Sequence, residues 1–89
     1  MNISGSWTVV LGGPARKGLK RIAPHDPERI HEALAEMAED PFRGDIKYLR
    51  GQKDTLRRRV GDWRIFFRLV RERKHVLVSA VERRTSTTY

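Results

Sequence analysis

Alternating apolar and polar residues predict two long, neighbouring β-strands in the second half of the chain. Within residues 63–70 every second side chain is large and apolar, as in a strand that lays one face against a core. Residues 55–60 alternate in a similar way, and Gly61-Asp62 between the two segments is a strong signal for a two-residue hairpin turn. The predicted core-facing side chains are Leu56, Val60, Trp63, Ile65, Phe67 and Leu69.

The same period predicts one further strand towards each end of the chain. Residues 6–11 are predicted to form the first strand. After a turn at 71–74, residues 75–84 are predicted to form the third strand of a meander with the two hairpin strands. Residues 42–51, which are interrupted by glycines, are predicted to be a loop. The residues that share the apolar face of the first strand are Trp7, Val9 and Leu11.

A period of 3.6 residues predicts two helices between the first strand and the hairpin. The clearer helix follows the N-cap residue Asp26 and ends before Pro41. The other spans residues 14–22 and should be short, because Gly18 lowers its helix propensity. Only residues 23–25 separate the two helices, so they should pair as an αα-hairpin. The apolar stripe of the clearer helix is Ile30, Ala33, Leu34, Met37 and Ala38.

These elements define one α+β domain that covers residues 1–89, in the order β-α-α-β-β-β. A chain of 89 residues has room for one core. The helical hairpin should pack on one face of a small, twisted, mainly antiparallel sheet. The other face of the sheet is then left open for binding.

Composition narrows the class of protein. Hydrophobic residues make up 38% of the chain, which is enough for a modest core although 34% of the residues are charged. The absence of cysteine excludes disulfides, cysteine metal sites and thiol catalysis. No apolar run approaches the roughly 18 residues that cross a bilayer, and no signal-peptide pattern is present. We therefore expect a cytoplasmic protein without a membrane partner.

The formal net charge of +8 lies entirely in the second half of the chain. Residues 1–44 carry six basic and six acidic side chains, whereas residues 45–89 carry thirteen basic and five acidic ones. Such asymmetry favours a polyanionic partner: nucleic acid first, then an acidic protein segment, then an anionic membrane surface. The alternative is that the positive charge of residues 45–89 only keeps the protein soluble.

Strand alternation gathers arginines on the predicted open face. Guanidinium groups bind phosphate through two parallel hydrogen bonds, and aromatic rings stack on unpaired bases, so this face is a candidate cradle for single-stranded RNA. The alternative is a charged hairpin that only discourages aggregation between strands. The candidate residues are Arg57, Arg59, Arg64, Phe66 and Arg68, joined by Arg83 and Tyr89 from the last strand and the tail.

Arg58 does not fit this alternation. It shares its strand face with Leu56 and Val60 and should therefore point toward the helices. Two explanations are open: its side chain reaches water at the edge of the sheet, or a bulge shifts the register.

Four segments resemble toxins of the RelE/ParE superfamily over nearly the whole chain. They are "WTVVLGGPARKGLKRI", "DPERIHEALAEMAEDP", "DIKYLRGQKDTLRRRVGDWRIFFRLV" and "VLVSAVERRTSTTY". The most specific features are "LRG" at 49–51 before an arginine-rich strand, "VGDWRI" at 60–65 and a terminal "RR" near a tyrosine. The resemblance implies the toxin of a bacterial type II toxin-antitoxin pair.

For RelE-like members, the resemblance implies metal-free and cofactor-free cleavage of mRNA in the ribosomal A site. The 2′-hydroxyl attacks the adjacent phosphate and leaves a 2′,3′-cyclic phosphate and a free 5′-hydroxyl. Arg64 and Arg83 would hold the scissile phosphate, Arg57 and Arg59 the neighbouring phosphates and the leaving oxygen, and Tyr89 would stack on a base or orient the 2′-hydroxyl. These five residues are the predicted catalytic set.

The chain departs from the family pattern at the group that would accept a proton. Relatives often carry lysine where this chain has Arg57 or Arg59, and arginine stays protonated, so neither arginine is a general base. Many relatives have histidine beside the terminal arginine, where this chain has Glu82. Glu82 is then either a base or, as we favour, an ion-pair partner.

Two other functions remain open: a ParE-like poison of DNA gyrase, and a catalytically inactive relative. Both toxin hypotheses imply an acidic, partly disordered antitoxin, which we expect to cover Arg57, Arg59, Arg64 or Arg83 or to displace Tyr89. The ribosome and mRNA are the further partners of the nuclease, and gyrase is that of the alternative.

Overall fold

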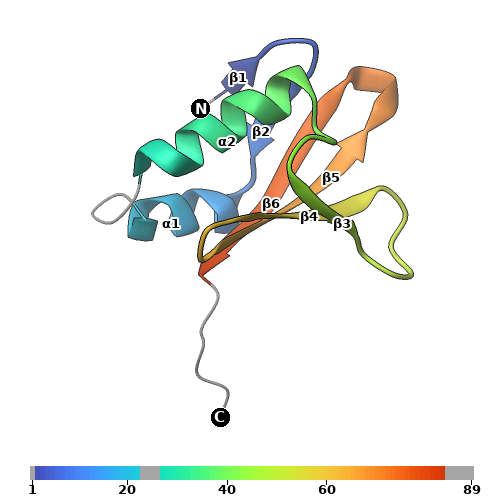
Figure 1. Ribbon diagram of the computed structural model, residues 1–89. Helices are drawn as coiled ribbons and strands as arrows, with labels where there is room; N and C mark the ends of the chain where they lie inside the picture. The colour runs from blue at the N-terminus through green and yellow to red at the C-terminus, as the bar shows by residue number, and fades with distance from the viewer. Residues whose placement is uncertain (1, 23–26, 84–89) are drawn as a thin grey trace.

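A computed structural model of the protein describes residues 2–22 and 27–83, and it contains one sheet with two helices on the same face (Figure 1). The predicted α+β class is therefore confirmed. The predicted N-cap Asp26 and the joint at 23–25 lie outside the described residues. In chain order the elements are β1 (Asn2–Ser4), β2 (Thr8–Leu11), α1 (Gly13–Ile22), α2 (Pro27–Glu39), β3 (Asp45–Tyr48), β4 (Thr55–Val60), β5 (Trp63–Val70), a 3-10 turn (Arg71–Arg73) and β6 (His75–Arg83).

The sheet has six described strands in the order β1-β2-β6-β5-β4-β3. Only β2 and β6 are parallel neighbours, and every other neighbouring pair is antiparallel. A parallel pair needs a long connection, which the helices and the meander supply. The C-terminal strand is thereby inserted in the middle of the sheet, beside the arginine-rich hairpin.

Both strands of the predicted hairpin have the predicted bounds, but the prediction missed two edge strands. β3 lies in the segment predicted as a loop, and β1 precedes the first predicted strand. That strand also begins at Thr8 rather than at residue 6. The backbone N–H of Trp7 donates to the carbonyl of Ala38 at the end of α2, at 2.7 Å, so it is not free for strand pairing.

The core lies between the helices and the sheet. α1 packs against β6, and α2 packs against β1, β2 and β4. Every residue of the predicted apolar stripe of α2 is buried, as is the predicted apolar face of β5. No helix in the described ranges is long and apolar enough to cross a membrane.

Gly18 allows α1 to approach β6 closely. A β-carbon at this position would collide with the carbonyl oxygen of Val81. The glycine that lowers the helix propensity of α1 is thus required by packing, and α1 still extends over ten residues.

Gly18→Ala is expected to destabilise the protein by about 1–3 kcal/mol, because the added methyl group forces the helix away from the sheet. This loss exceeds the roughly 0.5–1 kcal/mol that alanine gains in helix propensity. Urea denaturation measures the difference. Lys17→Ala, on the exposed side of the same helix, is the control and should change stability by less than about 0.5 kcal/mol.

Candidate functional site

Two arginines face each other across the hairpin on the side of the sheet opposite the helices. Arg59 in β4 is the direct cross-strand partner of Arg64 in β5. The turn that joins them needs Gly61, whose φ of +59° is the positive first angle of a II′-type hairpin turn. Side chains in such register lie about 5 Å apart at their β-carbons, so two like charges are held together at some cost in stability.

Neither arginine of this pair has a hydrogen-bond or ion-pair partner among the described residues. Both side chains are half-buried, and the Nε atoms of Arg59 and Arg64 are shielded from solvent without an acceptor. Two adjacent cations with unsatisfied donors form a site that an anion with several oxygens, such as a phosphate, would complete.

Arg57 lies next to this pair and is partly neutralised. Its cross-strand partner in β5 is Phe66, so the predicted aromatic residue lies on the same side of the sheet. We call this side, which is opposite the helices and carries Arg57, Arg59, Arg64 and Arg68, the arginine face. The Nη2 atom of Arg57 is 3.8 Å from Oδ1 of Asp45 in β3, a long ion pair with a mostly exposed carboxylate. Arg57 is therefore a weaker anion site than Arg59 and Arg64.

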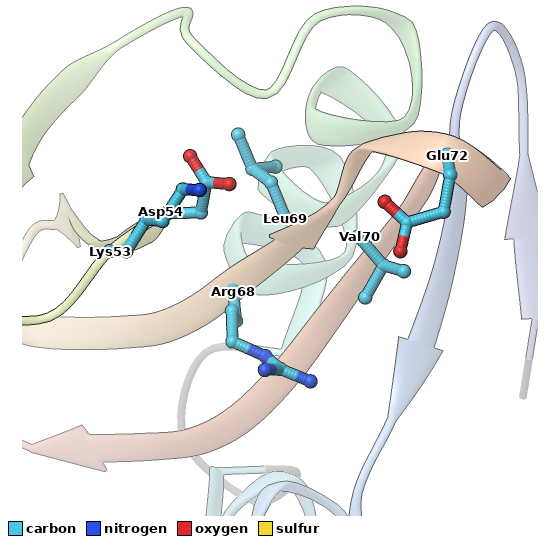
Figure 2. Close-up of a pocket in the computed structure, with 6 residues that line it drawn as sticks. All are labelled: Lys53, Asp54, Arg68, Leu69, Val70 and Glu72. Carbon is cyan, nitrogen blue, oxygen red and sulfur yellow. The ribbon is translucent and has the colours of Figure 1, made fainter.

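Arg68 lies at the other end of this face. It is four residues from Arg64 along β5, about 13 Å at strand spacing, and it is exposed. Figure 2 shows its side chain pointing away from Leu69, beside an open pocket of about 270 Å³. The pocket is lined by Lys53, Asp54, Arg68, Leu69, Val70 and Glu72.

The prediction that Arg83 joins the arginine face is wrong. The register between β5 and β6 shifts at Phe66/Phe67, where Ser79 is the extra residue of a β-bulge, and the Ser79 hydroxyl donates to the carbonyl of Phe66 at 3.1 Å. Beyond the bulge Arg83 pairs with the core-facing Trp63, and its guanidinium carbon lies 6.0 Å from the Trp63 ring centroid. Tyr89 lies outside the described residues.

The bulge places Glu82 on the arginine face instead. Glu82 is the direct cross-strand partner of Arg64. Since Asp45 is likewise the partner of Arg59, one row across four strands reads Asp45, Arg59, Arg64, Glu82. Two carboxylates thus flank the arginine pair from opposite sides.

β3 contributes two residues to this face that the prediction missed. They are Asp45, in the row described above, and Lys47, the cross-strand partner of Arg57. The alternation in "DIKY" was the available signal, because Ile46 between them packs against the core. The glycines of this segment favoured a loop.

Arg58 points toward the helices, as its position in β4 predicts, but neither predicted explanation holds. It is buried, and β4 pairs regularly with β5 without a bulge. Its guanidinium is paired with the Glu36 carboxylate and donates to the carbonyl of Ala33 at 3.3 Å, both in α2. The hydrogen bond from Arg58, and then its charge, lower the pKa of Glu36 below the ordinary value of 4.5.

Comparison with solved structures identifies the fold as that of RelE toxins. The RelE–RelB complex from Pyrococcus horikoshii OT3 matches with a TM-score of 0.78 and 19% identity, over 93% of this chain and 100% of that chain. The isolated E. coli RelE toxin matches with a TM-score of 0.76 and 21% identity, over 89% and 85%. The toxin-antitoxin complex RelBE2 from Mycobacterium tuberculosis matches with a TM-score of 0.73 and 24% identity, over 94% and 100%.

A match between the sequence and a family model identifies the family of this chain. Residues 9–87 match the family described as the ParE toxin of the type II toxin-antitoxin system, parDE. The comparison with curated proteins gave no match. The chain therefore belongs to the ParE toxin family within the RelE/ParE superfamily, as its sequence motifs predict.

Proposed function

We propose that this toxin is a metal-independent endoribonuclease that cleaves mRNA on the ribosome, in the cytoplasm, and that Arg59 and Arg64 hold the scissile phosphate. The observation that carries this proposal is the half-buried arginine pair without an anionic partner among the described residues. A pair of like charges is costly to maintain, and a bound phosphate removes that cost.

The chemistry needs no further group to bind the phosphate. The 2′-oxygen of the substrate forms a bond to phosphorus, the bond from phosphorus to the 5′-oxygen breaks, and negative charge builds on the phosphoryl oxygens. Arg59 and Arg64 stabilise that charge because their guanidinium groups are already oriented by the two strands. Arg57, Lys47 and Arg68 lie along the same face and would hold neighbouring phosphates.

Phe66 is the one aromatic side chain of this surface among the described residues. It is half-buried, lies between Arg64 and Arg68 along β5, and offers a ring on which an unpaired base can stack. Its presence favours single-stranded RNA over a duplex, whose bases are already stacked.

A ParE-like gyrase poison is the second candidate, and the family match favours it. Two assays on the purified toxin separate the candidates. In primer extension on translated mRNA, we expect cuts at defined codon positions, with 2′,3′-cyclic phosphate ends. Inhibited supercoiling by gyrase without such cuts would overturn the nuclease proposal, and inactivity in both assays would identify an inactive relative.

We also propose an acidic antitoxin that covers the arginine face. The similar structures from M. tuberculosis and P. horikoshii named above are toxin-antitoxin complexes, and the E. coli RelBE complex is similar as well. Because Arg59 and Arg64 are unpaired among the described residues, an acidic segment would neutralise them and block access together. Protection of β4 and β5 from hydrogen exchange in the complex tests this; protection confined to α2 would refute it.

A further inference from the structure

Cleavage by the 2′-hydroxyl needs a group that accepts its proton, and the arginine pair cannot supply one, because guanidinium stays protonated. Arginines aside, four titratable side chains within the described residues stand on the strands of the sheet and point to the arginine face. They are Asp45, Lys47, His75 and Glu82.

Three of these four are poorly suited to the task. Asp45 is 3.8 Å from Arg57 and so already has a cationic partner. Lys47 is a basic residue opposite Arg57, where it belongs with the groups that bind phosphate. His75 opens β6 and is seven residues from Glu82, roughly 20 Å at strand spacing.

Glu82 is the remaining group, and its surroundings suit a proton acceptor. It is exposed and has no hydrogen bond or ion pair among the described residues. Arg64 is the charged group that faces it from β5. β2 ends at Leu11, opposite Val78, so no strand of residues 2–22 or 27–83 flanks Glu82 on the other side. α1 packs on the opposite face of β6, where Gly18 meets Val81.

The bulge at Ser79 is what gives Glu82 this position. With regular alternation from Val76 and Val78, Glu82 would face the helices and Arg83 would face the arginine row. The extra residue exchanges the two, and the hydrogen bond from Ser79 to Phe66 holds the bulge.

We propose that Glu82 is the general base of the cleavage reaction, an inference that rests on the proposed nuclease function. Its carboxylate accepts the proton of the 2′-hydroxyl while the 2′-oxygen bonds to the phosphorus held by Arg59 and Arg64. The bond from phosphorus to the 5′-oxygen breaks, the departing oxygen takes a proton from water, and Glu82 returns its proton to solvent. No oxidant, metal or co-reactant is consumed.

Single-turnover cleavage of ribosome-bound mRNA tests this proposal. Glu82→Gln is expected to lower the rate of the chemical step by about 10²–10⁴-fold, the contribution typical of a general base, without weakening binding. Glu82→Asp should retain part of the activity. Glu32→Gln, which changes an exposed glutamate of α2 on the other side of the sheet, is the matched control and should cleave at the wild-type rate.

The pH dependence of cleavage by Glu82→His distinguishes a general base from a residue with a purely structural role. Histidine has an ordinary pKa near 6.5, so the rate of this variant should rise with pH through that region, while the wild-type rate stays flat there. Wild-type cleavage with an equally active Glu82→Gln would overturn the assignment of Glu82 and leave the nuclease proposal standing. Absence of cleavage by the wild type would instead overturn the nuclease proposal.

Discussion

Arg64→Ala is expected to lower the single-turnover rate of mRNA cleavage by about 10²–10³-fold, because it removes an oriented donor from the charge that develops on the phosphate. The same change should leave the stability of the fold unchanged or slightly raised. Among the described residues Arg64 has no hydrogen-bond or ion-pair partner to lose, and its removal relieves like-charge repulsion with Arg59, worth roughly 0.2–1 kcal/mol. Cleavage kinetics and urea denaturation on the same preparations measure both effects.

Arg68→Ala is the matched control for the loss of one positive charge from the same strand and face. It should weaken RNA binding and reduce its salt dependence by about one charge, with little change in the chemical step. Arg83→Ala should also be milder than Arg64→Ala, because Arg83 faces Trp63 rather than the arginine pair. Equal losses of cleavage rate in Arg64→Ala and Arg68→Ala would mean that the face attracts RNA only through its total charge. An unchanged rate in Arg64→Ala would mean that these arginines serve only to prevent aggregation.

The two arginine strands could be predicted from the sequence because their signals are local. Alternation of side chains and the Gly61-Asp62 turn fix both strands and which arginines share a face. Edge strand β3 has weaker signals: it is short, most of its side chains are exposed, and its alternation rests on the single core-packed residue Ile46. Its pairing with β4 is a tertiary effect, and Lys47 and Asp45 went unpredicted with it.

The position of Arg83 could not be predicted because it depends on a single extra residue. Ser79 carries no sequence signal for a bulge. One added residue nevertheless moves every later side chain of β6 to the opposite face of the sheet. The family resemblance implies a role for Arg83 but does not fix the face of the sheet on which Arg83 lies. Similarly, Glu36, the partner of the buried Arg58, lies 22 residues away in α2, and the alternation of β4 carries no information about that helix.

Glu36→Ala is expected to destabilise the protein by about 1–3 kcal/mol, because it leaves the buried Arg58 guanidinium without its counter-charge. Breaking a fully buried pair costs about 3–5 kcal/mol, but the Glu36 side chain is 42% exposed, so water partly replaces the lost partner. Arg58 already has an Nε atom without an acceptor. The double variant Arg58→Met with Glu36→Ala should recover most of the loss, since an apolar side chain needs no partner.

Acid should weaken this ion pair in a predictable direction. The pKa of Glu36 is lowered in the folded protein, so its stabilising contribution is complete above the ordinary glutamate value of 4.5 and is lost as the pH falls through the lowered pKa. The difference in unfolding free energy between wild type and Glu36→Gln should therefore shrink in acid and be constant near neutral pH. Glu32→Gln, on the exposed side of the same helix, is the control. A Glu36→Gln variant as stable as wild type at neutral pH would contradict the pairing, because Arg58 would then be sufficiently solvated without a carboxylate beside it.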